Sequence, residues 1–321
     1  MSAPASPTGS IFDEDGALSR AYLLARGYCC EHGCRNCPYG FREGRAVTAT
    51  APVGVRPGKP PERIVSLCPS NTEIAWSLGL GERLVGVDDW SDWPAAIREL
   101  PRVGPDLGVN VDRVVALRPD LVLASLSVPG MERNVARLRE RGLPYLVLDP
   151  HGLADLWANL REVGRATGVA ARAEEVVAAL QARVERVRAA SARRSLRPKV
   201  YWEWWPRPLF APGGRNWLTE ITSLAGGESV TGGIDADCAR PHPDEVRAAD
   251  PDWIFLVWTG VAKEKVRPEV LLRRPGWRDL RAVRLGRVRV LDEGLFCRPS
   301  PRLIDGLEQL AALLRSDEGT A

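Results

Sequence analysis

Short apolar runs alternate with segments of helical periodicity along most of this chain. The runs that predict strands are bounded by turn residues and cover residues 64–68, 84–87, 121–124, 145–148, 200–204, 253–257 and 288–291. Between them, apolar side chains recur at a spacing of three or four positions, which predicts helices at residues 70–78, 111–118 and 131–141 and from Ser300 onward. Continuous apolar strands that alternate with helices predict an α/β fold, in which helices cover both faces of parallel sheets.

The longest helical pattern runs from Val169 to about Arg194 without a glycine or a proline. Its apolar side chains form one stripe, made up of Ala173, Val176, Val177, Leu180, Val184 and Val187. At 1.5 Å per residue such a helix would be roughly 39 Å long, about the width of a domain. We therefore expect one long helix that joins two lobes and limits their relative motion.

A repeated phrase supports the expectation of two lobes. Residues 112–120 and 244–252 each open with Asp, share Val and Ala at the same offsets, close with Pro-Asp and lead into an apolar run. Upstream of each copy, Thr-Glu-Ile occurs at residues 72–74 and again at residues 219–221. Two matches in the same order predict a doubled α/β unit, and hence two Rossmann-like lobes with a ligand groove between them.

Composition along the chain sets the expected boundaries. The first residues are small, polar and acidic, which predicts disorder, and residues 43–61 contain four prolines. We expect a disordered tail at residues 1–17, a Cys-rich module at 18–42, a linker at 43–61, an N-terminal lobe at 62–151, bridging helices at 152–197 and a C-terminal lobe at 198–316.

The overall composition is that of a folded, soluble protein, with 45% apolar and 26% charged residues among 321. A net charge of +3 gives no indication of a nucleic-acid partner. No apolar stretch approaches the ~20 residues that span a bilayer. The N-terminal residues lack the basic start and the apolar core of a secretory signal, so we expect a cytoplasmic protein that acts as a monomer.

Four cysteines and one histidine lie within nine N-terminal positions, namely Cys29, Cys30, His32, Cys34 and Cys37. Four thiolates can form a tetrahedral zinc site or hold an iron-sulfur cluster. A segment this short needs such a metal cross-link to fold. Neighbouring side chains diverge, so His32 could replace Cys29 or Cys30 as a ligand. The motif resembles a short Cys-rich module of small uncharacterised bacterial proteins. We predict a metal site here, with redox-active thiols or an unstructured tail as the alternatives.

Four segments in the expected order carry a resemblance to a known family. They are residues 63–73, 86–94, 114–122 and 298–302. The arrangement resembles the substrate-binding proteins of ABC importers whose lobes are bridged by one long helix, and within them the vitamin B12 branch. The resemblance implies a bilobed α/β fold with the ligand between the lobes. It implies cobalamin or another corrinoid as the ligand, while relatives that bind haem, iron chelates or bare metals share the framework.

In the vitamin B12 branch, aromatic side chains at strand ends pack against the flat corrin ring. The positions here that match this role, or that could face it from the second lobe, are Trp90, Trp93, Trp202, Trp204, Trp205, Phe210, Trp258 and Phe296. Aromatic side chains suit such a ligand because they bury a large area with little rotamer entropy to lose. The alternative is that these tryptophans belong to the core, as we expect for Trp76, Trp157 and Trp217.

The resemblance also implies residues that dock on a membrane transporter. Glu73 matches an acidic docking position on the first lobe, with Asp244 or Glu245 as its partner on the second. Glu73 also has the spacing of a capping box with Ser70, which would close a helix start instead. A first-lobe position that is aromatic in vitamin B12 binders falls near residues 106–108, where this chain has Asp-Leu-Gly.

No motif for catalysis is present: the chain lacks the phosphate-binding glycine loops, the Gly-x-Ser-x-Gly elbow and the His-Glu-x-x-His zinc motif. We therefore expect a binding protein and not an enzyme. The alternative is a redox enzyme, in which an iron-sulfur cluster at the N-terminal cysteines acts on a corrinoid or metal in the groove. Cys68, Cys238 and Cys297, with Asp89 and His242, could reach the groove as metal ligands or be small buried side chains.

Overall fold

The structure is a computed structural model that describes residues 52–54, 59–193 and 196–315. Its first lobe contains a parallel sheet in the order β2-β1-β3-β4. The strands are β1 (Ile64–Ser66), β2 (Leu84–Val87), β3 (Leu121–Ser125) and β4 (Tyr145–Leu148). The helices of this lobe are α2 (Pro69–Ser77), α3 (Val111–Ala116) and α4 (Glu132–Glu140), with short 3-10 turns at Gly81–Arg83 and Ala95–Glu99.

The second lobe contains a parallel sheet in the order β11-β10-β5-β8 and a small antiparallel sheet in the order β6-β7-β9. The strands of the parallel sheet are β5 (Lys199–Glu203), β8 (Glu228–Ser229), β10 (Trp253–Leu256) and β11 (Val288–Val290). Those of the antiparallel sheet are β6 (Trp205–Pro206), β7 (Leu209–Pro212) and β9 (Cys238–Ala239). The helices are α7 (Trp217–Leu224), α8 (Pro243–Ala249), α9 (Arg281–Arg284), α10 (Glu293–Phe296) and α11 (Leu303–Arg315), with 3-10 turns at Lys263–Lys265, Pro268–Arg273 and Trp277–Asp279.

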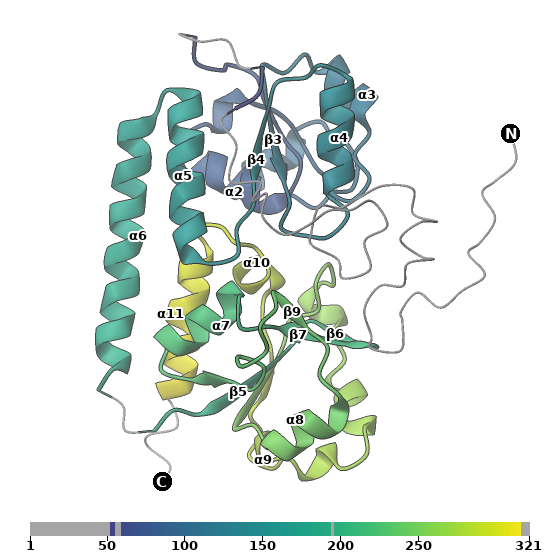
Figure 1. Ribbon diagram of the computed structural model, residues 1–321, viewed down its shortest axis with the longest axis vertical. Helices are drawn as coiled ribbons and strands as arrows, with labels where there is room; N and C mark the ends of the chain where they lie inside the picture. Colours follow the sequence, from purple (N-terminus) through teal and green to yellow (C-terminus); the bar gives the residue numbers. More distant parts are fainter. Residues whose placement is uncertain (1–51, 55–58, 194–195, 316–321) are drawn as a thin grey trace, which may run out of the picture.

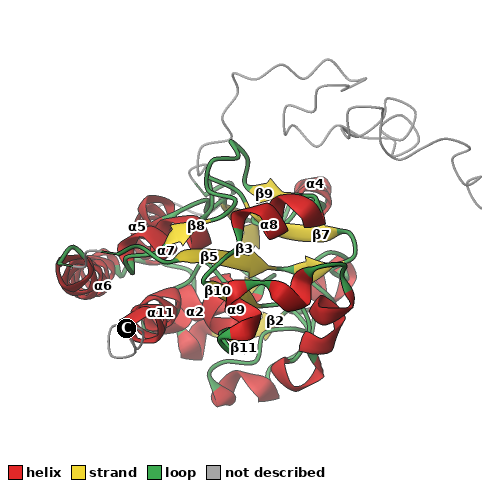
Figure 2. Cartoon of the chain, turned by 90° about the horizontal axis from the view of Figure 1, so that it is seen from below, coloured by secondary structure: helices red, strands yellow, loops and turns green. Residues whose placement is uncertain are grey.

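Helices cover both faces of the parallel sheets, as the continuous apolar strands predict. In β1, Ile64 packs into one hydrophobic cluster and the next residue, Val65, packs into another on the opposite face. The same holds in the second lobe, where Tyr201 and Trp202 of β5 belong to different clusters. Figure 2 shows the strands surrounded by helices. The predicted α/β fold with two lobes is confirmed.

The bridge between the lobes consists of the expected long helix and a second helix that packs against it. α5 (Leu153–Thr167) and α6 (Ala170–Ser191) pack against each other along one flank of the molecule (Figures 1 and 2). Gly168 separates them in the left-handed conformation, with φ 76°, which favours glycine. α5 contacts α2 of the first lobe, while α6 contacts α7 and α11 of the second. One hydrophobic cluster therefore continues from one lobe to the other along this flank.

The repeated sequence segment, residues 112–120 and 244–252, has the same structural role in both lobes. Each copy forms a short helix, α3 or α8, and a residue with positive φ follows the helix within two positions, Arg118 (48°) or Asp250 (43°). The Pro-Asp pair that follows leads directly into the next strand, β3 in the first lobe and β10 in the second. Asp120 accepts a hydrogen bond from the Arg63 backbone N–H (2.7 Å) before β1, and Asp252 accepts one from the Lys199 N–H (2.8 Å) at β5. The two lobes are thus built on one duplicated unit.

Candidate functional site

The carboxyl ends of the two parallel sheets face each other across the boundary between the lobes (Figure 1). β4 leads into α5 at this boundary, and β5 runs toward it from the far end of the second lobe. Loops that follow the strands of a parallel sheet gather at its carboxyl edge, where α/β proteins bind their ligands. The facing edges of the two sheets are therefore the candidate site.

Large apolar side chains are exposed at this edge on both lobes. Trp90 follows β2 and is 54% exposed, and Leu107 is 42% exposed in a loop tied to the end of β2. On the second lobe, Trp205 follows β5 and is 40% exposed, and Ile234 is 41% exposed in the loop after β8. Burying an exposed large apolar side chain is favourable, so residues of this kind gathered at one edge indicate a binding surface.

The loop that carries Trp90 is held rigidly from within. Asp88 is buried and accepts hydrogen bonds from the backbone N–H groups of Trp90 (2.8 Å) and Ser91 (3.1 Å). Arg102 donates to the carbonyl oxygens of Asp88 (2.8 Å) and Ser91 (2.7 Å). Burial raises the pKa of Asp88 to about 6, and the nearby carboxylate of Asp106 adds to this. Trp90 thus presents its exposed ring on a fixed support.

The small antiparallel sheet forms the corresponding surface on the second lobe. Trp205 of β6 lies opposite Phe210 of β7 in the register, so the two rings share one face of the sheet. The guanidinium of Arg240, which follows β9, lies over the Phe210 ring at 4.6 Å from its centroid. The ring of Trp258 packs near Trp205, with 6.4 Å between the two ring centroids. The rings of Trp205 and Phe210 and the guanidinium of Arg240 therefore line the edge of the second lobe.

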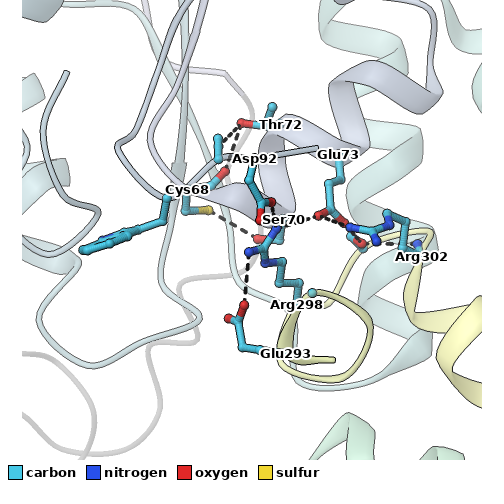
Figure 3. A network of polar contacts seen from close by, with 12 residues as sticks. Cys68, Ser70, Thr72, Glu73, Asp92, Glu293, Arg298 and Arg302 are labelled. Carbon is cyan, nitrogen blue, oxygen red and sulfur yellow. Dashed lines mark hydrogen bonds and ion pairs between the residues drawn. The ribbon is translucent and has the colours of Figure 1, made fainter. Parts of the chain in front are cut away.

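A network of ion pairs joins the lobes beside these surfaces (Figure 3). Arg298, between α10 and α11, donates to Glu73 of α2 (3.1 Å), to Asp92 (2.6 Å) and to Glu293 (3.0 Å). The Glu73 carboxylate also accepts hydrogen bonds from Ser300 and from Arg302 (3.2 Å). Glu73 is 1% exposed, and this burial raises the pKa of its carboxyl, while Arg298 counteracts the effect. We refer to Glu73, Arg298, Ser300 and Arg302 as the interlobe latch.

A second set of contacts starts from residues of the second lobe and reaches the end of the first lobe and the start of α5. Glu220, the counterpart of Glu73 in the repeated Thr-Glu-Ile, accepts a hydrogen bond from the Leu153 backbone N–H (2.8 Å) at the start of α5. The His151 imidazole lies between two carboxylates. Its Nε2 is 3.5 Å from Oδ1 of Asp149 in the first lobe, and its Nδ1 is 3.3 Å from Oδ1 of Asp237 in the second lobe. Hydrogen bonds to these two carboxylates raise the pKa of His151 to about 10, so its imidazole is protonated near neutral pH. Both duplicated glutamates therefore make contacts outside their own lobe, Glu73 with the second lobe and Glu220 with the start of the bridging helix α5.

The predicted capping box at Ser70 and Glu73 does not form. α2 begins at Pro69, one residue before Ser70, and no side chain caps it. Proline suits the first position of a helix because it lacks the N–H that would be unsatisfied there. This start frees the Glu73 side chain, which points to the second lobe.

The structure separates the eight predicted aromatic ligand contacts into two groups. Trp90, Trp205 and Phe210 lie at the facing edges with exposed or half-buried rings. Trp93 is half-buried at the boundary, with the Arg302 guanidinium 4.9 Å from its ring centroid. Trp204 is half-buried and packs against Trp217, with 6.0 Å between ring centroids.

The prediction fails for Trp202, Trp258 and Phe296, which are buried. Trp202 packs between Phe255 and Phe296 and donates its indole N–H to Thr222 (2.8 Å). Trp258 donates its indole N–H to the buried Glu203 (3.2 Å). Because helices cover both faces of the β5 sheet, side chains of both alternations along β5 point into a core. These three rings stabilise the second lobe and do not line the site.

Sequence reasoning missed several residues of the facing edges. Leu107 lies in the segment 106–108, near which the resemblance puts an aromatic position of vitamin B12 binders, and its apolar side chain is exposed next to the Trp90 loop. Ile234 stands alone as a large apolar residue in a polar, glycine-rich loop, which is a signal that could have found it. Nothing in the sequence pattern indicated that Arg240 lies on Phe210 or that Arg298 holds Glu73.

The predicted docking residues lie in different environments. Glu73 is enclosed by the latch and offers no free carboxylate to a partner. Asp244 and Glu245 are exposed in the first turn of α8, where Glu245 accepts a hydrogen bond from the His242 N–H (2.6 Å). The counterpart of Asp244 in the repeat is Asp112, which is exposed in the first turn of α3.

The thiols of Cys68, Cys238 and Cys297 all have a raised pKa, with desolvation as the main cause. Burial raises the pKa of Cys68 to about 12 and raises that of Cys297 further still. Cys238 is exposed as a residue, yet desolvation raises its thiol pKa to about 11. Within the described residues, no three His, Cys, Asp or Glu side chains are grouped to hold a metal ion, Asp89 and His242 included. The N-terminal ligand set Cys29, Cys30, His32, Cys34 and Cys37 lies outside the described residues.

Among residues 52–54, 59–193 and 196–315, no helix is both long enough and apolar enough to cross a membrane.

A family model described as "Periplasmic binding protein" matches residues 64–295, and a model described as a family of unknown function matches residues 16–43. An uncharacterized ABC transporter substrate-binding lipoprotein of Bacillus subtilis (strain 168) is 28% identical over 264 residues, which cover 81% of this chain and 82% of the relative.

Two further relatives carry names that state a ligand. The vitamin B12-binding protein of Yersinia pestis (strain Pestoides F) is 29% identical over 268 residues, covering 81% of this chain and 89% of the relative. The solved structure of the periplasmic heme-binding protein RhuT from Roseiflexus sp. RS-1, in apo form, has a TM-score of 0.70 and 28% identity. That match covers 78% of this chain and 97% of the other.

Proposed function

Because the chain belongs to the periplasmic binding protein family, we propose that it is an ABC-transporter type substrate-binding protein that holds a corrinoid between its lobes. The observation that carries the proposal is the set of four exposed apolar side chains at the facing edges, Trp90 and Leu107 from one lobe and Trp205 and Ile234 from the other. A macrocycle offers two broad faces, and two opposed apolar surfaces can cover both. The relatives named above are binding proteins, and this chain is a binding protein and not an enzyme.

The chemistry of the edge favours a corrinoid over haem. Haem iron in proteins takes an axial ligand from His, Cys, Met or Tyr. The imidazole of His151 is held by two carboxylates, and the thiols of Cys68 and Cys297 are kept protonated by burial. Cobalamin brings its own axial ligands to cobalt, so a site that supplies only apolar surface and hydrogen bonds is sufficient for it.

A panel titration tests this function. We expect full-length protein to bind cyanocobalamin or dicyanocobinamide at one molecule per chain with a Kd of about 1 μM or tighter, measured by calorimetry. Because the ligand binds only the folded state, a concentration of about 100 times Kd should add about 2.7 kcal/mol to the free energy of unfolding. Haemin serves as the competing macrocycle. Absence of heat and of stabilisation with both corrinoids would refute the proposal, whether or not haemin binds.

Docking on a transporter would use exposed acids. Asp244 and Glu245 on α8 and Asp112 on α3 occupy equivalent first turns of the two lobes and are exposed, with Asp244 paired to Arg247 (3.0 Å) and Asp112 to Arg141 (2.6 Å). We infer that this pair of helix starts, and not Glu73, is the acidic docking surface. The location of the protein stays a prediction: the sequence predicts the cytoplasm, whereas one relative is named a lipoprotein and another periplasmic.

We also propose that the N-terminal cysteines bind a metal, which the residue types and their spacing support. Full-length protein is expected to contain about one zinc per chain, or a cluster that absorbs near 400 nm, by elemental analysis and spectroscopy. Replacing Cys34 and Cys37 with serine should remove the metal, because two of the four thiolates are lost. The matched control is Cys238→Ser, which should leave the metal content unchanged. Metal-free wild-type protein prepared under anaerobic conditions would contradict the proposal.

A further inference from the structure

Glu203, the last residue of β5, carries a carboxylate that is enclosed completely in the second lobe. It is 0% exposed and accepts two hydrogen bonds from the Arg274 guanidinium, at 2.5 and 3.2 Å. A third hydrogen bond comes from the Trp258 indole N–H, at 3.2 Å. Because no part of Glu203 reaches solvent, any influence of this carboxylate on a ligand must pass through the residues that it holds.

One path leads from Glu203 to the backbone of the strand that carries the exposed Trp205. The same nitrogen of Arg274, Nη2, donates to the Glu203 carboxylate (3.2 Å) and to the Pro206 carbonyl oxygen (3.2 Å). The guanidinium also lies over the buried Trp277 ring, 4.4 Å from its centroid. β6 consists of Trp205 and Pro206 alone, so the ion pair ties the whole of this short strand to the core of the lobe.

A second path leads from Glu203 to the Trp205 ring itself. The hydrogen bond to Glu203 fixes the Trp258 indole, which is only 8% exposed. The Trp258 ring lies 6.4 Å from the Trp205 ring, centroid to centroid, with the two planes inclined by 57°. Aromatic pairs at such separations prefer particular relative orientations. A fixed Trp258 therefore favours one orientation of Trp205.

The cost of burying the ion pair argues for a role in fixing a conformation. Desolvating a carboxylate and a guanidinium is expensive, and apolar side chains of similar volume often stabilise a core as well or better. A buried charge pair does favour one arrangement strongly, because any other arrangement leaves a charge without its partner. The Glu203–Arg274 pair, with side chains 0% and 12% exposed, meets this description.

We propose that Glu203 is a positioning residue, which holds the exposed Trp205 ring in the orientation that stacks on a macrocycle. The inference rests on the proposed function and adds to it a residue that does not touch the ligand. A ring that is already held in its binding orientation loses little conformational freedom when the ligand arrives, so this pre-organisation raises the affinity. The first lobe has a comparable arrangement, in which the buried Asp88 holds the backbone at Trp90.

Spectra of the ligand-free protein test the positioning directly. In full-length protein labelled with 5-fluorotryptophan, with signals assigned by single Trp→Phe variants, Glu203→Gln is expected to shift the ¹⁹F signal of Trp205. The reason is that the neutral amide alters the contacts with both Arg274 and Trp258. The signal of Trp90, on the other lobe, should stay in place.

A second variant and a matched control accompany Glu203→Gln. Arg274→Lys keeps a positive charge beside Glu203 but lacks the planar fork that also reaches β6, so it should shift the Trp205 signal as well. It carries the test if Glu203→Gln unfolds the lobe. The control Thr222→Val removes the acceptor of another buried indole N–H, that of Trp202, and should leave the Trp205 signal unchanged. An unchanged Trp205 signal in the folded variants of Glu203 and Arg274 would overturn the proposal.

A double-mutant cycle tests the consequence for affinity. By calorimetry with the corrinoids, Glu203→Gln is expected to raise the Kd by about tenfold in the wild-type background. In the Trp205→Ala background the same change should raise it by less than about twofold, because the ring to be positioned is gone. A purely structural role would leave the Kd unchanged or raise it equally in both backgrounds, and either result would rule out positioning while leaving corrinoid binding intact. Failure of both corrinoids to bind the wild type would refute the proposed function, and the spectra of the ligand-free protein would then decide the role of Glu203 alone.

Discussion

The variant Arg298→Met is expected to lower the free energy of unfolding by about 3–5 kcal/mol, the usual effect of removing one partner from a buried ion pair. Glu73, 1% exposed, would then be left in the interior with only Ser300 and Arg302 as partners. The exposed Asp92 and the half-buried Glu293 lose a partner at smaller cost, because water can reach them. Urea denaturation followed by circular dichroism measures the change.

Two companion variants test whether the loss of stability comes from the Glu73 carboxylate that has lost its ion pair with Arg298. Adding Glu73→Gln to Arg298→Met should recover a large part of the loss, since the amide is neutral. Arg183→Met removes an arginine that pairs with Asp305 and Glu308 on the surface between α6 and α11, and it should cost no more than about 1 kcal/mol. A stability of Arg298→Met within about 0.5 kcal/mol of the wild type would show that the latch does not hold the lobes.

The loss in Arg298→Met should grow as the pH rises. Burial raises the pKa of Glu73 above its ordinary value of 4.5, and Arg298 opposes this rise. Without Arg298 the folded-state pKa moves further up, so the folded protein holds the Glu73 proton more tightly than the unfolded chain does. Stability then falls with increasing pH between 4.5 and the raised pKa. Relative to the wild type, the variant should therefore be least impaired in acid and most impaired at neutral pH.

The second large effect concerns the ligand. The double variant Trp90→Ala, Trp205→Ala is expected to weaken corrinoid binding by about 100-fold, or about 2.7 kcal/mol, because it removes one exposed ring from each lobe. Its free energy of unfolding should fall by less than that of the core variant Trp202→Ala, because both rings are partly exposed, although Trp205 loses its contacts with Phe210 and Trp258. Calorimetry gives the Kd, and urea denaturation gives the stability.

Matched controls separate the site from the core. Trp202→Ala should cost about 3–5 kcal/mol of stability, because it opens a cavity between Phe255 and Phe296. Leu285→Ala removes an exposed apolar side chain that precedes β11, at the opposite edge of the sheet, and should change neither quantity. Wild-type affinity in the double variant would place the ligand elsewhere on the protein.

Much of the fold could be predicted from the sequence, because its signals are local. Apolar runs gave the strands, and the repeated Asp-to-Pro-Asp phrase marked two equivalent helix ends that feed two equivalent strands. The long helix of the bridge could be predicted because the apolar stripe from Ala173 to Val187 is so regular, while the separate helix that ends before Gly168 was given no bounds of its own. α6 alone is 22 residues long, and its partner α5 provides the contact with the first lobe.

The site was harder to predict because exposure depends on packing from distant segments. Alternation along residues 200–204 gives no means of telling an exposed face from a buried one when helices cover both sides, so Trp202 was misplaced. The aromatic surface of the second lobe instead depends on the hairpin that pairs Trp205 with Phe210. The latch joins residues more than 200 positions apart, and no local pattern connects Glu73 with Arg298.

Labelling the protein with 5-fluorotryptophan and recording ¹⁹F spectra during a corrinoid titration tests the central claim most directly. Single Trp→Phe variants assign the signals. Direct contact with a macrocycle is expected to shift the signals of Trp90 and Trp205, which project from facing edges of the two lobes, while those of the buried Trp202 and Trp277 stay in place. Shifts confined to one lobe, or to the buried rings, would contradict a ligand held between the two carboxyl edges.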